Sequence, residues 1–365
     1  MFSWLTRRVL EPPAIGLDIS DLSVKFVRVR HEGSRLAIDA FGEVAIPPGI
    51  VVDGEVKREA DLTSVLKAEL RDQRGRSLNE RFCVAALPEE KSFVRVLELP
   101  KLAAQDLGLA VRWEVEGAVP LRFDEIYYDY ELIASRRPPP APPDHQDVLL
   151  TAFPRAVIAS YERAISAAGL RLTALELESQ AICRAVISDA LLGDSLLLID
   201  IGAVRSSFII FAGSTLVFTK SIPLGGRDIE ATIAKELGVS LEEARAIKVE
   251  HGFDAGYENG RLTSALSPLL VTLVTELGLE LAFYRDHPRT KHAELPDISA
   301  VYLCGGDANL AGLAEYLAAA VRKDVRIADP LVKLPAAPGV VPPIPKNQAL
   351  QYATAIGLAL RAVGY

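Results

Sequence analysis

Two stretches of the chain, far apart in the sequence, repeat one arrangement of residues that suits phosphate binding. Residues 15–25 and 198–207 each contain an apolar run, an aspartate, a small residue two places later and a short polar stretch before the next apolar run. This order predicts a β-hairpin whose turn carries a carboxylate and backbone N–H groups. Successive N–H groups in a tight turn form a concave site for an anion, such as the β- or γ-phosphate of a nucleotide. Two such hairpins, one from each half of the chain, are expected to close on a phosphate chain from opposite sides.

The side chains of these hairpins have types that match a phosphate and its metal ion. Asp18 and Asp200 are expected near the phosphates, where a carboxylate is useful if it holds Mg²⁺ directly or through water. Lys25 and Arg205 would offset phosphate charge. The hydroxyl donors are Ser23, Ser206 and Ser207, and the turn positions are Ser20 and Gly202. The alternative is two ordinary hairpins, because aspartate is common in turns; their repetition at matching positions favours phosphate binding.

A third segment with similar chemistry lies late in the chain. An apolar run ending at Leu303 leads into Cys304-Gly-Gly-Asp-Ala-Asn309 and then a helical pattern. Two glycines let a ligand approach the backbone closely, and a helix N-terminus favours anions. We therefore assign Gly305, Gly306 and Asp307 to the same candidate site.

The elements that must position these residues come in the same order twice. Strand patterns span 14–19, 24–30, 36–46, 82–87, 93–99, 127–133, 148–153 and 170–177 in the first half, and 196–211, 216–221 and 298–303 in the second. Helical patterns span 61–71, 102–117, 154–169, 178–191, 228–237, 241–249, 267–287, a segment ending at 322, and 348–362. The first of these helices has Asp61 as its candidate N-cap. This order predicts a duplicated α/β protein.

Composition limits the classes of function that are open to the chain. Its 365 residues favour two domains, and half of them are hydrophobic, as in ordinary globular proteins. The net charge of −8 argues against nucleic acid as a partner. No run of about 18 apolar residues predicts a membrane-spanning helix. Apolar and basic residues within Met1–Leu10 are compatible with contact to a membrane surface, but a frayed terminus is the preferred interpretation.

The three cysteines show no pattern of a disulfide or metal site. Cys83, Cys183 and Cys304 are far apart, and each lies in an apolar run. We interpret them as small buried hydrophobic residues, with a reducing cytoplasm as the default compartment.

The order of the motifs resembles that of the actin-like ATPases. Hairpin, hairpin, a helix containing Ala246-Ile-Lys-Val-Glu-His-Gly252, and the Cys-Gly-Gly-Asp-Ala-Asn loop follow one another as the nucleotide motifs do in those proteins. Within them, the chain resembles the PilM family of type IV pilus assembly proteins and, more distantly, the FtsA cell-division proteins. Further matching phrases are Leu175-Glu-Leu-Glu-Ser-Gln-Ala-Ile182, Thr219-Lys-Ser-Ile-Pro-Leu-Gly-Gly226 and Leu279-Glu-Leu-Ala-Phe-Tyr284. The resemblance runs from about Ile15 to the last helix.

The resemblance implies an actin-like α/β fold with two ribonuclease-H-like halves and a subdomain inserted in the first. The expected boundaries are 1–81 and 156–194 for the first half, 82–155 for the inserted partner-binding subdomain, 195–347 for the second half, and 348–365 for a C-terminal helix that returns to the first half. Within the second half, about 226–297 are expected to form a helical subdomain on the nucleotide side.

The same resemblance implies ATP with Mg²⁺ between the two halves, and Lys248 on the adenosine helix. Glu178 begins a helix where such folds place a residue that orders the attacking water, although a solvated acid in a first helical turn is an equal alternative.

Two residues depart from the family pattern: Ser20 replaces a glycine of the first phosphate turn, and Arg245 replaces a glutamate. A positive φ at Ser20 would cost about 1 kcal/mol, and a guanidinium cannot accept hydrogen bonds from ribose. We therefore expect an ATP-binding adaptor or weak ATPase.

The partner that the resemblance implies is the N-terminal cytoplasmic tail of a PilN-type, single-span inner-membrane protein. That tail is expected in a groove of the first half beside the inserted subdomain. Through it the chain would join the other pilus platform proteins, as a cytoplasmic protein peripheral to the inner membrane. Self-association into a homo-oligomer stays open. The alternatives are a sugar or short-acid kinase of the same superfold, and an FtsA-like cytoskeletal or cell-division protein.

Overall fold

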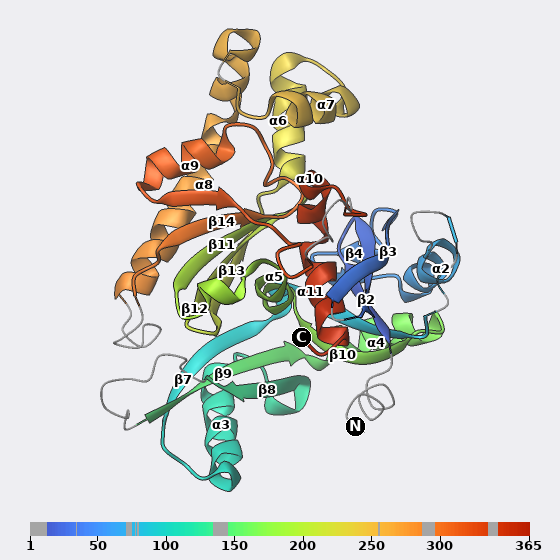
Figure 1. The fold of residues 1–365 in the computed structure, drawn as a ribbon, viewed down its shortest axis with the longest axis vertical. Helices are drawn as coiled ribbons and strands as arrows, with labels where there is room; N and C mark the ends of the chain where they lie inside the picture. The colour runs from blue at the N-terminus through green and yellow to red at the C-terminus, as the bar shows by residue number, and fades with distance from the viewer. Residues whose placement is uncertain are drawn as a thin grey trace. The chain divides into compact units, whose positions relative to one another are not determined.

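The computed structural model describes residues 13–33, 35–70, 75–76, 78, 80–133, 145–254, 256–286, 296–334 and 342–365 (Figure 1). The chain forms two compact units. Over the described residues, unit 1 comprises 13–133, 145–190 and 329–365, and unit 2 comprises 191–328. The C-terminal segment therefore belongs with the N-terminal half of the chain.

Unit 1 is built around a five-stranded sheet in the order β10-β6-β1-β2-β3. The strands are β1 (Ala14–Ile19), β2 (Ser23–Glu32), β3 (Arg35–Ala45), β6 (Phe82–Leu87) and β10 (Arg171–Leu177). β1, β2 and β3 are antiparallel neighbours, whereas β6 lies parallel to β1 and to β10. All residues of β1 are buried, which explains why its sequence is an apolar run interrupted by a single aspartate.

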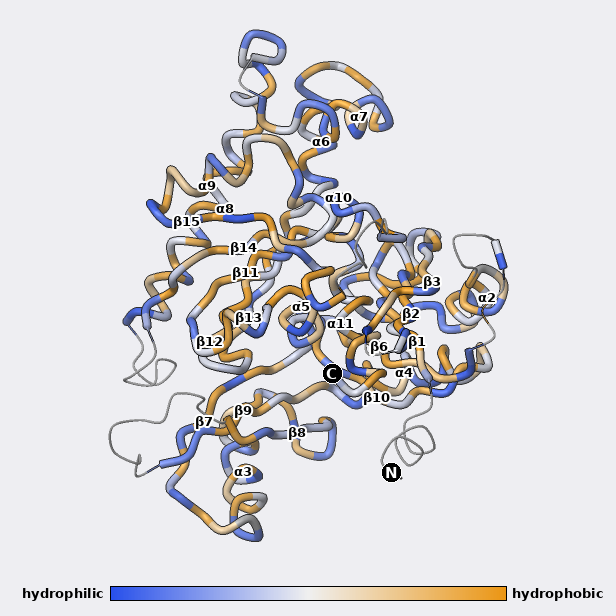
Figure 2. Tube along the Cα trace, viewed as in Figure 1, coloured by the Kyte–Doolittle hydropathy of each residue, from blue (hydrophilic) through white to orange (hydrophobic). Residues whose placement is uncertain are grey.

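The last helix of the chain completes the core of unit 1. Here α10 (Lys346–Ala349) and the 3₁₀ turn η5 (Leu350–Tyr352) lead into α11 (Ala353–Ala362), which contacts β1, β2, β6 and α5 (Glu178–Val186). Figure 2 shows that α11 is largely hydrophobic. Two glycines allow this close packing. A Cβ atom at Gly16 would lie 2.2 Å from the Ala355 carbonyl oxygen, and one at Gly357 would lie 1.8 Å from that of Ala181.

Two further helices of unit 1, α2 (Glu59–Glu69) and α4 (Arg155–Ala167), contact each other. A small hairpin precedes α2 and consists of β4 (Val51–Val52) and β5 (Glu55–Val56). The sequence pattern placed the start of α2 at Asp61. In the structure α2 begins two residues earlier, after Arg58, and no side chain caps it. Asp61 instead lies in the first turn of the helix, where its charge complements the helix dipole.

The inserted part of unit 1 has a sheet and a core of its own. Its three strands are β7 (Phe93–Pro100), β9 (His145–Pro154) and β8 (Ile126–Leu132), antiparallel and in that order, and α3 (Ala104–Ala118) packs on one face. The core comprises Leu97, Leu99, Leu107, Val111, Val115, Val119, Ile126, Val148, Leu150 and Ala152. β6 pairs with β1 in the larger sheet, so the inserted sheet begins at Phe93 rather than at the expected residue 82.

Unit 2 contains the second five-stranded sheet, in the order β13-β12-β11-β14-β15. The strands are β11 (Ser195–Ile201), β12 (Ser206–Ala212), β13 (Thr215–Ile222), β14 (Ala300–Cys304) and β15 (Asp324–Ile327). The helices are α6 (Gly226–Leu237), α7 (Leu241–His251), α8 (Arg261–Asp286) and α9 (Leu313–Val321). The hairpin β11–β12 with the parallel strand β14 repeats the hairpin β1–β2 with the parallel strand β6. β15 leaves no apolar pattern in the sequence and was not predicted, because this edge strand is short and mostly exposed.

One helical run, Tyr257–Asp286, is long and apolar enough to cross a membrane by length and composition alone. Within it, α8 buries Leu262, Leu266, Leu270, Leu273, Leu277 and Tyr284 and contacts α6, α9 and β12. Although only 28% of its apolar window is buried, this one-sided burial is typical of a helix that packs one face against the core of a globular protein.

All three cysteines are buried as reduced thiols, as the sequence pattern predicts. Burial raises the pKa of Cys83 and of Cys183 to about 12, which keeps both thiols protonated and unreactive.

Candidate functional site

In unit 1 the first candidate phosphate turn is the tight turn between strands β1 and β2. Ser20 organises it: its backbone N–H and its hydroxyl both donate to the Ser23 carbonyl, at 2.9 and 3.0 Å, and its hydroxyl accepts from the Ser23 N–H at 3.3 Å. Among the described residues, the non-glycine positions with positive φ are Asp53, Glu258, Asn259 and Arg322. Ser20 is therefore unstrained, and the cost that a positive φ would have imposed does not arise.

The charges of this hairpin lie on neighbouring strands. Asp18 and Lys25 are register partners on β1 and β2. The Lys25 ammonium donates to the Ser23 hydroxyl at 2.8 Å and pairs with Glu43 at 3.3 Å. Burial raises the pKa of the Asp18 carboxyl; Lys25 opposes this shift and Glu43 adds to it. A desolvated carboxylate of this kind gains from any cation placed beside it, which fits the predicted Mg²⁺ role.

The turn is tied to the rest of unit 1 by Asp21, which the sequence analysis did not single out. Its two carboxylate oxygens accept the backbone N–H groups of Asp53 and Gly54, both at 3.0 Å, in the β4–β5 connection. Gly54 in turn accepts a hydrogen bond from the buried Tyr161 hydroxyl of α4 at 3.0 Å. Asp21 has the turn chemistry that could have predicted this role, but its partners come from a hairpin too short to recognise in the sequence.

Tyr161 brings the predicted catalytic residue into the same region. Burial raises its pKa well above the usual value, and the charges of Glu178, Glu90, Asp21 and Asp18 act in the same direction. Glu178 is the first residue of α5 and is partly exposed, as the sequence predicts. The hydroxyl of Tyr161 thus lies within electrostatic range of both Asp18 and Glu178.

The N-terminus of α5 is capped by a residue from far away in the sequence. The buried carboxylate of Glu89 accepts hydrogen bonds from the backbone N–H and the hydroxyl of Ser179, both at 3.1 Å. A carboxylate at this position satisfies an orphan donor and complements the helix dipole. It fixes the turn from which Glu178 projects, and no local sequence signal could have revealed it.

In unit 2 the second candidate turn, between β11 and β12, lies against the Pro-Leu-Gly-Gly turn that precedes α6. The Gly226 N–H donates to the Gly202 carbonyl at 3.0 Å, and the Ser206 hydroxyl donates to the Leu224 carbonyl at 2.7 Å. A Cβ atom at Gly225 would lie 2.7 Å from the Arg205 nitrogen and the Gly202 oxygen. Only glycine fits there, so the two turns form one compact backbone surface.

The Gly-Gly-Asp loop after β14 joins the same surface. Gly305 has φ +91°, and a Cβ atom there would lie 2.4 Å from the Ile201 carbonyl oxygen and 2.7 Å from Oδ1 of Asp200. The Asp307 N–H donates to the Ile201 carbonyl at 3.1 Å. Unit 2 therefore brings together the predicted residues Asp200, Gly202, Arg205, Ser206, Lys248, Gly305, Gly306 and Asp307.

Lys248 is engaged inside the protein. Its buried ammonium pairs with Asp307 at 2.6 Å and with Glu230 of α6 at 2.8 Å. Burial raises the pKa of the Asp307 carboxyl, against the attraction of Lys248 and, more weakly, of Arg245. The backbone of Gly226 lies against both groups, because a Cβ there would come within 1.8 Å of Oδ2 of Asp307. Lys248 thus connects α6, α7 and the Gly-Gly-Asp loop.

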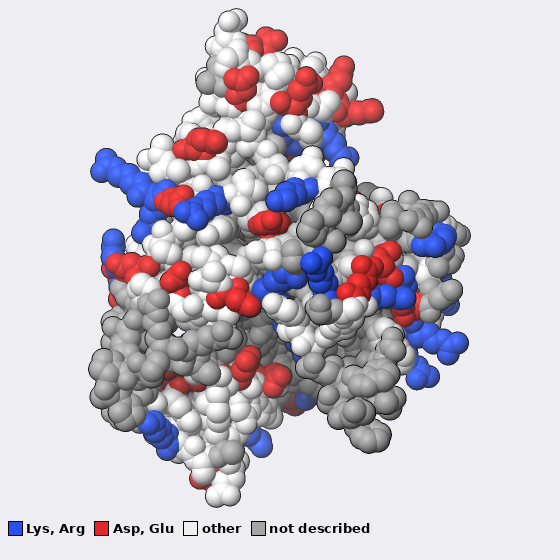
Figure 3. Space-filling model, in the orientation of Figure 1, with Lys and Arg blue, Asp and Glu red and all other residues white. Residues whose placement is uncertain are grey.

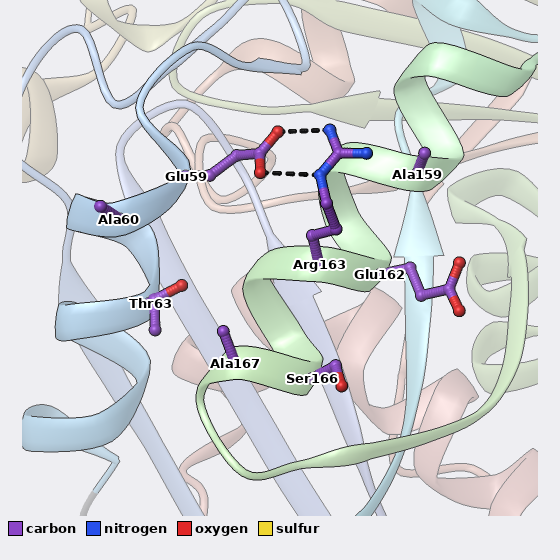
Figure 4. Close-up of a pocket in the computed structure, with 8 residues that line it drawn as sticks. All are labelled: Glu59, Ala60, Thr63, Ala159, Glu162, Arg163, Ser166 and Ala167. Atoms are coloured by element: carbon purple, nitrogen blue, oxygen red, sulfur yellow. Dashed lines mark hydrogen bonds and ion pairs between the residues drawn. The ribbon is translucent and has the colours of Figure 1, made fainter.

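A groove of about 830 Å³ in unit 1 lies elsewhere, between α2 and α4 (Figure 4). It is lined by Glu59, Ala60, Thr63, Ala159, Glu162, Arg163, Ser166 and Ala167. Arg163 spans it with two hydrogen bonds to Glu59, at 2.6 and 2.9 Å. None of the predicted nucleotide residues lines this groove.

Within the described part of the chain, no cluster of three or more His, Cys, Asp or Glu side chains forms a ready metal site, so the roles of Asp18 and Asp200 toward Mg²⁺ stay a prediction.

Comparison with known proteins places the whole chain in one family. Residues 16–363 match the family described as type IV pilus assembly protein PilM. The chain belongs to this family. A solved chain of the "PilM-PilN type IV pilus biogenesis complex" is 26% identical, with a TM-score of 0.79 over 97% of this chain and 100% of that one. The resemblance inferred from the order of the motifs is therefore confirmed.

Other similar structures establish the fold alone. MreB5 of Spiroplasma citri bound to ADP is 13% identical, with a TM-score of 0.54 over 95% of each chain. The ethanolamine utilization protein EutJ from Carboxydothermus hydrogenoformans is 16% identical, with a TM-score of 0.53 over 96% of this chain and 89% of that one. Together with the PilM match they confirm the actin-like α/β fold.

The curated relatives are cell division proteins FtsA and match only in part. The protein from Agrobacterium fabrum (strain C58) is 27% identical over 150 residues, which is 36% of this chain and 34% of the relative. The protein from Escherichia coli (strain K12) is 24% identical over 190 residues, or 46% and 45% of the two chains. This chain thus spans between a third and a half of the length of these relatives.

Proposed function

We propose that this chain is an adaptor of the type IV pilus inner-membrane platform that binds the cytoplasmic tail of a PilN-type membrane protein. The observation that carries the proposal is the likeness to a chain of a PilM–PilN complex, with a TM-score of 0.79 over 97% of this chain. The likeness covers 97% of this chain, so it includes the inserted subdomain. The proposed tail site lies beside this subdomain and therefore depends on it. The protein would be held at the cytoplasmic face of the inner membrane through this partner.

The test is a calorimetric titration of the purified chain with a synthetic peptide of the N-terminal cytoplasmic tail of a PilN-type protein. We expect saturable binding with one peptide per chain, and no binding of a peptide of scrambled sequence. Tails of unrelated single-span membrane proteins serve as a second control. Failure of every PilN-type tail to bind would overturn the proposal.

We also propose that the two hairpin turns and the Gly-Gly-Asp loop hold the phosphates of a nucleotide, with Mg²⁺ beside Asp18 and Asp200. The support is chemical: each unit presents one tight turn with a neighbouring carboxylate, and a glycine-bounded backbone surface surrounds the turn in unit 2. ATP is the expected nucleotide, and turnover is expected to be weak or absent. The exposed Arg245 stands where the family has a ribose acceptor.

Thermal unfolding with and without Mg-ATP tests nucleotide binding independently of the tail. A ligand at about 100 times its Kd stabilises the folded state by about 2.7 kcal/mol, so we expect a clear rise in Tm at millimolar Mg-ATP. Arg245→Glu should increase that rise, because it restores an acceptor for ribose hydroxyls. An unchanged Tm in both proteins would contradict nucleotide binding, and phosphate release would measure turnover.

A further inference from the structure

The outer face of α3 exposes two large apolar side chains next to each other. Trp113 is 74% exposed and Leu109 is 60% exposed. They are four residues apart and therefore neighbours on one side of the helix. The opposite side carries Leu107, Val111 and Val115, which are buried in the core of the inserted subdomain. Packing of the subdomain core thus explains why one side of α3 is apolar, but it does not explain the apolar residues on the exposed side.

This exposed side also contains a glycine and two acidic residues. Gly117 follows Trp113 by one turn, and a Cβ atom there would meet nothing within 4 Å. Asp106 precedes Leu109 by three residues, and Glu116 follows Trp113 by three, so both lie on the same side. We call this surface, made of Asp106, Leu109, Trp113, Glu116 and Gly117, the α3 face.

The charge around the α3 face is strongly negative. Over residues 93–133 and 145–154 the sequence has four basic and nine acidic residues, a net charge of −5 where the whole chain has −8. Of the basic residues, Arg112 already pairs with Glu116 at 3.3 Å and stacks on Phe123 at 4.7 Å from the ring centroid. In Figure 3 the visible surface over α3 is mostly free of charged side chains. Apolar and acidic side chains therefore lie together on this side of α3, and both kinds are exposed to solvent.

We propose that the α3 face is a docking site for a basic amphipathic helix of a partner protein. The apolar side of that helix would cover Trp113 and Leu109 and could approach the backbone of α3 closely at Gly117, which has no side chain. Its Lys or Arg residues would pair with Asp106 and Glu116. Tryptophan is one of the residue types enriched in interface hot spots, and complementary charge speeds and orients the encounter. This partner is additional to the tail of the PilN-type protein.

The same charges argue against two other occupants. A second copy of the chain would bring one acidic subdomain against another, and like charges across an interface are unfavourable. A membrane surface with anionic lipids would repel the subdomain for the same reason. A basic helix is the occupant whose apolar area and charge both match the α3 face.

The test uses the full chain and two synthetic amphipathic helical peptides of equal length, one built from leucine and lysine and the other from leucine and glutamate. The chain has two tryptophans, Trp4 and Trp113, so Trp4→Phe leaves Trp113 as a fluorescent reporter within the site. We expect the Leu/Lys peptide to shift Trp113 emission to the blue with saturable binding that weakens as salt increases. The Leu/Glu peptide should leave the emission unchanged.

Variants show whether the binding depends on the α3 face. Trp113→Ser and Leu109→Ser should each weaken calorimetric binding of the Leu/Lys peptide at least 10-fold, and Asp106→Lys should weaken it and admit the Leu/Glu peptide. Leu279→Ser, at a residue of α8 that is 53% exposed, is the matched control and should change nothing. All these variants should still bind the PilN-type tail.

Four results would overturn the proposal. They are equal binding of both peptides, binding that is insensitive to Trp113→Ser, loss of tail binding in Trp113→Ser, and self-association or binding to anionic vesicles that depends on Trp113. The third would assign the α3 face to the tail site, and the last would assign it to a second copy or to a lipid surface. Circular dichroism spectra of the variants would exclude misfolding as the cause of lost binding.

Discussion

Asp18 is a carboxylate in an unfavourable place for a charge. It lies on the fully buried central strand β1, and burial dominates the environment that raises its pKa. Lys25 compensates only in part, because its ammonium also serves Ser23 and Glu43. A residue in such a place is expected to have a role other than stability, and a Mg²⁺ ion bound with a phosphate would supply the missing positive charge.

The pH dependence of stability tests this interpretation. Because the folded-state pKa of Asp18 is above its unfolded value, its contribution is fully present below the unfolded pKa and is lost as pH rises through the folded pKa. We therefore expect Asp18→Asn to raise the Tm at pH 7, and the gain to shrink toward pH 4. Differential scanning fluorimetry across that range measures it. Asp21→Asn is the control and should lower the Tm, because it weakens the acceptor of two backbone N–H groups.

At the same scale, sequence patterns identified most of the candidate residues but not their partners. Types and spacing were enough to group Asp200 with Gly305 and Asp307. They could not show that Lys248 is already paired with Asp307 and Glu230, because this pairing depends on how α6, α7 and the loop after β14 pack together. Glu89 and Tyr161 were missed for the same reason: their hydrogen bonds to Ser179 and Gly54 span 90 and 107 residues.

At the scale of elements, α11 is held to unit 1 by an ion pair cluster around Glu176. This β10 carboxylate, 1% exposed, accepts from Arg184 of α5 at 3.0 Å and from Arg361 of α11 at 2.5 Å. Glu176→Gln would leave two guanidiniums without a counter-ion. We expect a loss of about 3 kcal/mol in the free energy of unfolding, the lower end for a buried pair because Arg361 is 43% exposed. Urea denaturation measures it.

The matched control for this variant is Glu59→Gln, which breaks the ion pair between α2 and α4 (Figure 4). That pair is largely exposed, so solvent screens it and its loss should have a much smaller effect. Equal losses in the two variants would contradict the role of Glu176 in attaching α11.

Two helical glycines offer a second comparison between elements. A Cβ atom at Gly357 would lie 1.8 Å from the Ala181 carbonyl oxygen, whereas one at Gly278 of α8 would meet nothing within 4 Å. Gly357→Ala should therefore force α11 away from α5 and destabilise the protein. Gly278→Ala should stabilise it by up to about 1 kcal/mol, because alanine favours helix. Opposite shifts in Tm are the expected result, and shifts of the same sign would contradict the packing described for α11.

Elements with strong local periodicity were predicted well, and those defined by tertiary pairing were not. The limits of β6 follow directly from its apolar run. Which sheet β6 joins is decided by its parallel pairing with β1 and β10, and a local pattern carries no information on that pairing. The start of α2 was misplaced because Asp61 resembles a cap, although the helix begins uncapped at Glu59.

At the scale of the whole molecule, the two compact units predict independent unfolding events. We expect calorimetry of the protein without ligand to resolve two transitions, since multidomain chains often depart from two-state behaviour. Glu176→Gln should lower the transition of unit 1, and Lys248→Met that of unit 2, because each variant leaves buried charges unpaired inside one unit. A single transition that both variants shift equally would contradict this division.

The assembly of unit 1 from three separate stretches of chain sets the order of events during protein synthesis. The ribosome completes all of Leu191–Ala328 before it reaches α11, so unit 2 has every residue of its sheet while unit 1 still lacks the helix that covers β1. Domains usually mature from the N-terminus onward during translation. Here β1 and β2 are synthesised first, but α11, which packs on them, is synthesised last. Until then their hydrophobic surface is accessible to chaperones.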